Sequence, residues 1–158
     1  MQQHRDYAKD MADLGLEVVG TYENGQFVLD PKVRPLSAFY VWMRKQNGIL
    51  IPIRVGETSR LGSRFSSYNG WLRGRRWPGE RRNARENEKA RLTKLRLNGS
   101  ALVAAAAVPS KEYGLAVERI LLELWRPTLD LNFELSSSWG RARMREWSAT
   151  YDQQANLN

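Results

Sequence analysis

Two Asn-Gly dipeptides constrain the fold of this chain more than any other feature. Asn24-Gly25 and Asn47-Gly48 each lie between two runs that are rich in β-branched and aromatic residues. Both central residues of the tightest hairpin turns need positive φ, so Asn-Gly between such runs is a strong hairpin signal. We therefore predict two hairpins, over residues 16–29 and 37–55. Proline has no backbone N–H to donate to a neighbouring strand. We therefore expect Pro52 to lie in an edge strand of the sheet or at a bulge.

The rest of the chain predicts helices and one further strand. The residues from Ala101 to Val108 include no polar side chain, which is typical of a buried strand. Apolar periodicity and capping residues predict helices over 2–14, from Thr58 or Ser59 to Asn69-Gly70, and over 84–97, 113–125 and 139–147. A length of 158 residues fits one domain. We expect a single α+β domain, with a small antiparallel sheet covered by helices.

The composition excludes several classes of enzyme. The chain has no cysteine and one histidine, His4. Disulfide scaffolds, Cys-ligated or His-ligated zinc, thiol nucleophiles and Ser-His-Asp triads are therefore excluded. No run approaches the ~18 apolar residues of a membrane helix, and residues 1–10 are polar. We expect a cytoplasmic protein.

Positive charge is concentrated in one segment. The formal net charge is +8, and residues 71–96 hold ten Lys or Arg against three Glu, together with Trp71 and Trp77. Clustered cations with aromatic residues are typical of a nucleic-acid surface. The alternative is an exposed helix with Glu–Arg pairs. The candidate DNA contacts are Arg60, Arg73, Arg75, Arg76, Arg81 and Arg82.

The apolar face of the 113–125 helix carries one carboxylate, that of Glu118. Its neighbours on this face, three, four and seven residues later, are Leu121, Leu122 and Trp125. A glutamate is rarely buried unless it is paired or binds a metal. Glu118 is therefore a candidate functional residue, with a salt bridge to an arginine as the alternative.

A second candidate group lies on the helix that follows residue 59. Arg60, Arg64 and Tyr68 are spaced four apart and share one face. Arg64 and Tyr68 flank the apolar pair Leu61 and Phe65, so the guanidinium at the margin of the core could clamp a phosphate. The alternative is a solvated arginine beside a half-buried tyrosine.

The thirteen residues 56–68 follow the pattern G-x-T-x-x-L-x-x-R-[LF]-x-x-[HY]. Ala38-Phe39-Tyr40 lies on the first predicted hairpin strand, before this run. Arg54-Val55-Gly56 lies on the second strand, and its glycine is the first residue of the run. Glu118 and Pro127 follow later in the chain. In this order the pieces resemble the GIY-YIG nuclease family over residues 37–132. The resemblance implies a three-stranded antiparallel core flanked by helices, here with an added N-terminal hairpin and C-terminal helix.

The chain departs from the family pattern at two places. Arg54 stands where the second tripeptide has its tyrosine, and some restriction enzymes of the family also have a basic residue there. Asp130 stands three residues after Pro127, where the family has an asparagine, and the nearest asparagine is Asn132. Whether Asp130 or Asn132 lines the site stays open at this point.

The resemblance implies an endonuclease that needs Mg²⁺ or Mn²⁺ and leaves 5′-phosphate and 3′-hydroxyl ends. Tyr40 would be the general base, and a cation at Arg54 would favour its phenolate. Arg64 would hold the phosphate, and Tyr68 would orient Tyr40 or the attacking water. Glu118 would bind the single metal ion.

The segments outside the core suggest the type of nuclease. Residues 1–36, 69–97 and 133–158 surround the core instead of forming a second domain, with 69–97 as a basic DNA-contacting insertion. This layout resembles the compact type II restriction endonucleases of the family, which implies double-stranded DNA as substrate and a homodimer.

Three residues of the last segment, Trp139, Arg143 and Trp147, could serve a dimer interface, contact DNA or pack in the core. The alternative functions are a non-catalytic nucleic-acid-binding module and a structure-specific or repair nuclease.

Overall fold

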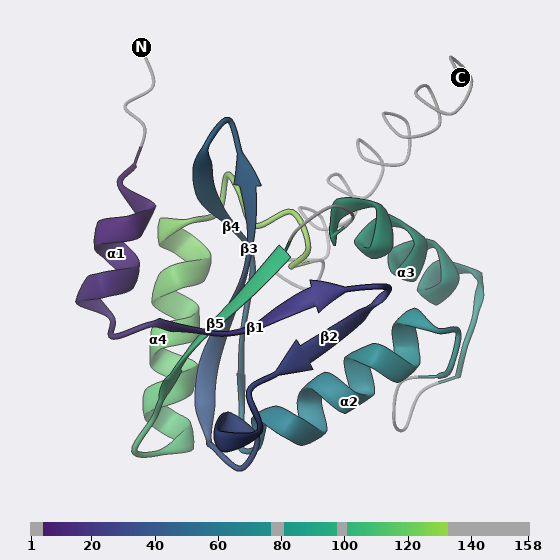
Figure 1. Cartoon of the computed structure of the whole chain (residues 1–158), viewed down its shortest axis with the longest axis horizontal. Helices are drawn as coiled ribbons and strands as arrows, with labels where there is room; N and C mark the ends of the chain where they lie inside the picture. The colour runs from purple at the N-terminus through teal and green to yellow at the C-terminus, as the bar shows by residue number, and fades with distance from the viewer. Residues whose placement is uncertain (1–4, 77–80, 98–100, 133–158) are drawn as a thin grey trace.

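A computed structural model describes residues 5–76, 81–97 and 101–132 (Figure 1). Five antiparallel strands form one sheet in the order β2-β1-β5-β3-β4. The strands are β1 (Glu17–Glu23), β2 (Gln26–Leu29), β3 (Ala38–Gln46), β4 (Ile49–Thr58) and β5 (Ala101–Ala107). The α+β class is thus confirmed.

The sheet has five strands, so the expected three-stranded sheet is wrong. The N-terminal hairpin is part of the sheet, because β1 pairs with β5 from Glu17 opposite Ala105 to Tyr22 opposite Ala101. Pairing between strands so distant in sequence leaves no local signal, and β5 would otherwise have exposed an unpaired edge. The hairpin therefore completes the sheet.

Both predicted hairpins are present, with the turns at the expected dipeptides. Asn24 and Asn47 each have φ of 52°, and the two following glycines have φ of 80° and 79°. Pro52 lies opposite Met43, directly after a register shift between Trp42 and Met43, and β4 is an edge strand. The two explanations for Pro52 therefore both hold.

Within the described residues, four helices cover the two faces of the sheet. They are α1 (Tyr7–Asp13), α2 (Leu61–Leu72), α3 (Ala84–Leu97) and α4 (Lys111–Leu124), with a 3₁₀ turn at Pro31–Val33. Figure 1 shows α1 and α4 on one side of the sheet and α2 and α3 on the other. Tyr40 and Trp42 of β3 pack toward α2, whereas Phe39 and Val41 pack toward α4.

The start of α2 differs from the prediction. Thr58 ends β4, and the N-cap of α2 is Arg60, which makes no side-chain capping bond. Instead, Leu61 N donates to Leu36 O at 2.9 Å and Gly62 N donates to Arg34 O at 2.8 Å. Backbone carbonyls of a preceding segment satisfy the first helical N–H groups, so no Ser or Thr cap is needed.

The end of α2 also differs, because Asn69-Gly70 does not stop the helix. The Asn69 amide is engaged elsewhere: its Oδ1 accepts from Phe27 N at 2.7 Å, and its Nδ2 donates to Phe27 O at 3.0 Å. The helix continues to Leu72 and ends before Gly74, which has φ of 97°.

Of the helix predicted over 2–14, the structure shows α1 over 7–13, and the other predicted elements within the described residues agree within a few residues. The helix expected at 84–97 is α3, and the strand expected at 101–108 is β5. The expected turn at Pro78-Gly79 and helix at 139–147 lie outside the described residues. In the part of the chain that the structure describes, every helix is too short or too polar to cross a membrane.

Candidate active site

Tyr40 is buried against a glycine. Its side chain is 1% exposed, and it lies directly opposite Gly56 in the β3–β4 pairing. A Cβ added at Gly56 would collide with the phenol oxygen and the adjacent ring carbon of Tyr40. The glycine at residue 56 therefore makes room for the ring of Tyr40 over the edge strand.

Tyr40, Tyr68 and Arg54 form one hydrogen-bonded group. The two phenol hydroxyls share a short hydrogen bond, and Arg54 Nε donates to Tyr68 Oη at 3.2 Å. Arg54 Nη1 donates to the carbonyl of Leu131 at 2.6 Å, which fixes the guanidinium. The structure thus brings together three of the predicted site residues, from β3, β4 and α2.

Arg54 also stacks on aromatic rings. Its guanidinium carbon lies 5.4 Å from the ring centroid of Trp42 and 5.6 Å from that of Tyr68. Both distances suit cation–π attraction. Trp42 was not predicted for the site, although its alternation with Tyr40 on a strand was a usable signal. It is 1% exposed, and its Nε1 has no hydrogen-bond partner among the described residues.

The environment of Tyr40 disfavours its phenolate. Burial raises the pKa of Tyr40 well above its ordinary value of 10.0, and Tyr68 adds to this shift. The charges of Arg54 and Arg64 act in the opposite direction but do not outweigh burial. Tyr40 is therefore a neutral phenol near pH 7. The expectation that Arg54 favours the phenolate required a net lowering of the Tyr40 pKa, and the net effect is an increase.

Arg64 and Glu118 belong to helices on opposite faces of the sheet. Arg64 is half-buried on α2, one turn before Tyr68. Glu118 is half-buried on α4, which covers the opposite face of the sheet. Gly114, one turn before Glu118, packs on Glu57 of β4, with an added Cβ only 3.5 Å from Glu57 Cβ. Glu118 is therefore one turn beyond the residue of α4 that contacts β4, the strand that carries Arg54 and Gly56.

The segment after α4 runs along the edge of β4. Asn132 accepts from Val55 N at 2.9 Å and donates to Val55 O at 2.8 Å. Leu131 N donates to Ile53 O at 3.0 Å. Asp130 pairs instead with Arg96 of α3, at 3.0 Å. Asn132 therefore lies beside the strand residue that precedes Gly56, and Asp130 has a separate ion-pairing role.

The predicted DNA contacts are mostly exposed. The exposed members are Arg60, Arg73, Arg75, Arg76 and Arg81. Arg82 is different, because its Nη1 donates to Trp71 O and Arg75 O, both at 2.9 Å, and its Nε donates to Asn87. Its guanidinium holds the segment after α2, so little of it is left for DNA.

On α3 some charged side chains pair with one another, as expected from the alternative interpretation of the basic segment as an exposed helix with Glu–Arg pairs. Arg91 pairs with Glu88 at 2.6 Å, and Lys89 pairs with Glu86 at 3.4 Å. Glu86 also accepts from Trp71 Nε1 at 3.2 Å. The exposed arginines outside α3 therefore form the stronger candidate for a polyanion contact.

No group of three His, Cys, Asp or Glu side chains with metal-binding spacing occurs in residues 5–76, 81–97 and 101–132.

A scan against protein-family models finds no match, and searches of curated proteins and of solved structures find no significant match.

Proposed function

We propose that this protein is a metal-dependent DNA endonuclease of the GIY-YIG type. The observation that carries the proposal is the buried Tyr40–Tyr68–Arg54 group beside Gly56. The order of elements adds support: hairpin β3–β4, helix α2, strand β5 and helix α4 occur in the order that the resemblance implies, with α3 between α2 and β5. Three of the residues that match the family motif, Tyr40, Arg54 and Tyr68, are thus in contact with one another.

Each side chain has a role in phosphodiester hydrolysis. Arg64 binds the reacting phosphate and stabilises the negative charge that grows on it. Tyr40 takes the proton of the attacking water when it is in its phenolate form. Tyr68 orients Tyr40 through the shared hydrogen bond, and Arg54 orients Tyr68.

The carboxylate of Glu118 would hold the metal. Mg²⁺ is commonly bound by one or two carboxylates together with waters and substrate phosphate oxygens. The half-buried Glu118, which belongs to no group of three acidic or histidine side chains among the described residues, fits that coordination. When bound, Mg²⁺ or Mn²⁺ would neutralise phosphate charge and stabilise the leaving oxygen.

The substrate in this proposal is double-stranded DNA, bound through the exposed arginines. A restriction enzyme that acts as a homodimer in the cytoplasm and leaves 5′-phosphate and 3′-hydroxyl ends is the form that the layout of the chain favours. A structure-specific or repair nuclease is the alternative form.

The raised pKa of Tyr40 favours a second candidate, a non-catalytic nucleic-acid-binding module. A neutral phenol cannot accept the proton of water, so this environment suits a purely structural tyrosine. Such a module would bind DNA and leave it intact.

Replacement of Glu118 tests the proposal. Glu118→Gln keeps size and removes the charge that would hold the metal, so we expect loss of plasmid cleavage in Mg²⁺ with DNA binding unchanged or tighter. Glu123→Gln, at an exposed position of the same helix, should cut as the wild type does. Cleavage by Glu118→Gln at the wild-type rate would remove Glu118 from the metal role.

A further inference from the structure

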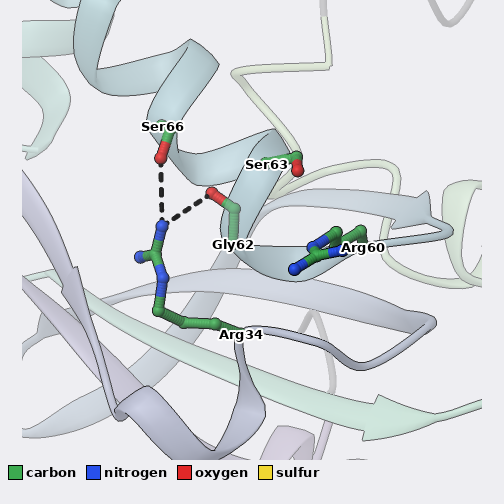
Figure 2. Close-up of a pocket in the computed structure, with 5 residues that line it drawn as sticks. All are labelled: Arg34, Arg60, Gly62, Ser63 and Ser66. Atoms are coloured by element: carbon green, nitrogen blue, oxygen red, sulfur yellow. Dashed lines mark hydrogen bonds between the residues drawn. The ribbon is translucent and has the colours of Figure 1, made fainter.

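A hollow of about 440 Å³ opens beside the first turn of α2. Figure 2 shows its lining, which comes from the segment after the 3₁₀ turn and from the first half of α2. The lining residues are Arg34, Arg60, Gly62, Ser63 and Ser66. Arg60 is one of the predicted DNA contacts, whereas Arg34, Ser63 and Ser66 have no role in the reaction proposed above.

The side chain of Arg34 is held in a fixed position. Its Nη2 donates to Gly62 O at 3.2 Å and to Ser66 Oγ at 3.1 Å (Figure 2). A Cβ added at Gly62 would lie 2.9 Å from Arg34 Cβ, so the glycine allows this close approach. Among the described residues Arg34 Nε and Nη1 have no hydrogen-bond partner. Two oriented donors are thus left for a ligand.

Arg60 supplies the second cation. It is exposed, and within the described part of the chain its guanidinium makes no hydrogen bond or ion pair. Figure 2 shows the guanidinium groups of Arg34 and Arg60 on either side of Gly62. Two cations beside one hollow, without a carboxylate in its lining, create a positive potential that an anion relieves.

The lining selects the chemistry of the ligand. It offers two guanidinium groups and two serine hydroxyls, and no large apolar side chain. Guanidinium donors match the oxygens of a phosphate, and hydroxyls add further hydrogen bonds. The backbone N–H groups of Leu61 and Gly62 are already bonded to carbonyls, so the side chains carry the recognition.

We infer that this hollow binds a backbone phosphate of DNA that flanks the reacting one. The inference rests on the proposed endonuclease function. Arg60 and Arg64, the residue proposed to bind the reacting phosphate, are one turn or roughly 6 Å apart along α2. The hollow is therefore within reach of a phosphate close to the reacting one on the same strand. Arg34 and Arg60 thereby fix the position of the strand relative to Arg64 and Tyr68.

The test measures DNA affinity against salt concentration. Binding of a fluorescein-labelled 20-base-pair duplex is followed by anisotropy in EDTA, for the wild type, Arg34→Ala, Arg60→Ala and Arg119→Ala. Each lost phosphate contact should lower the slope of log affinity against log salt by about 0.9, which is roughly eightfold in affinity at 0.1 M salt. Arg119, exposed on α4, is the control of equal charge and should leave the slope unchanged.

A second arm separates DNA from free phosphate. Inorganic phosphate is titrated into ¹⁵N-labelled protein, and the Nε–H signals of Arg34 and Arg60 are followed. Lowered slopes in both variants support the inference. Unchanged slopes overturn it, and shifts of the two arginine signals would then identify a site for free phosphate. Arg60→Ala remains decisive if Arg34→Ala fails to fold, because the Arg60 side chain makes no hydrogen bond with described residues.

The measurements also distinguish failure of the phosphate site from failure of the endonuclease proposal. Plasmid cleavage by the wild type together with unchanged slopes contradicts only the phosphate site. A wild type that neither binds nor cuts DNA contradicts both.

Discussion

Gly56 and Tyr40 determine the geometry of the candidate site at the level of single residues. Gly56→Ala places a methyl group against the phenol of Tyr40. Overpacking of this kind costs about 1–3 kcal/mol, so we expect a lower free energy of unfolding, measured in urea, and loss of any cleavage. Gly114→Ala is the control: its Cβ would lie 3.5 Å from Glu57, and alanine is favoured in a helix by about 0.5–1 kcal/mol. A Gly56→Ala protein as stable as the wild type would contradict this packing.

The pKa of Tyr40 predicts how cleavage depends on pH. Because burial raises this pKa well above 10.0, the phenolate is scarce at neutral pH, and the single-turnover rate should rise from pH 7 to pH 10. The groups that act on Tyr40 are Tyr68, Arg54 and Arg64. Arg54→Ala removes a cation that lowers the pKa, so its profile should shift to higher pH. Tyr40→Phe should be slower by about 10²- to 10⁴-fold.

The two variants must behave differently for the base assignment to stand. Activity in Arg54→Ala should recover partly at high pH, whereas Tyr40→Phe should stay low throughout. Equal, pH-independent deficits in both variants would argue against Tyr40 as the base. Full activity in Tyr40→Phe would exclude it.

At the scale of elements, α1 is attached to the chain segment that ends α4. Asp10 accepts from Arg5 Nε at 2.5 Å and from Trp125 Nε1 at 2.9 Å. Burial raises the pKa of Asp10, but the hydrogen bonds and the charge of Arg5 outweigh it, so the pKa lies below 3.8. The contribution to stability is therefore present above the unfolded-state pKa and is lost as the pH falls through the lower, folded-state value.

Asp10→Asn should remove this pH-dependent contribution. We expect the variant to be less stable than the wild type near pH 7, with a difference that shrinks below about pH 4. Urea unfolding from pH 3 to pH 7 measures it, with Asp13→Asn at an exposed position of the same helix as the control. A difference between Asp10→Asn and the wild type that is constant with pH would contradict the ion-pairing account.

Sequence signals predicted the elements best where those signals are local. The Asn-Gly turns, α3 and β5 depend on neighbouring residues and were found close to their observed bounds. The N-terminal capping of α2 depends on the distant carbonyls of Arg34 and Leu36. The continuation of α2 past Asn69 depends on the bonding of that side chain to Phe27. The pairing of β1 with β5 is equally non-local, so none of these three features has a local pattern.

The same limit applies to the candidate site. Tyr40, Arg54 and Tyr68 were identified from motif positions, and the fold brings them into contact. The inward bonding of Arg82 and the edge pairing of Asn132 depend on which backbone groups remain unpaired in the folded chain. Residue type alone does not specify such partners. The net pKa shift of Tyr40 was likewise missed, because burial outweighs the nearby charges.

At the scale of the whole molecule, the sheet separates two sets of groups that phosphodiester hydrolysis would need together. Tyr40, Tyr68 and Arg64 belong to the face covered by α2, whereas Glu118 is carried by α4 on the other face. The two faces are linked through β4, because its Arg54 donates to Tyr68 of α2 and its Glu57 lies against Gly114 of α4. We place the proposed reaction beside this strand, because a phosphate there would be near side chains from both faces.

Cleavage of supercoiled plasmid by the wild-type protein tests this account most directly. The reaction is run with Mg²⁺ and with EDTA, and the ends of any product are labelled and sequenced. The account predicts cleavage only with the metal, with 5′-phosphate and 3′-hydroxyl ends. Plasmid that stays intact in Mg²⁺ and in Mn²⁺, at protein concentrations that saturate its binding to DNA, would contradict the endonuclease assignment and leave the binding module as the function.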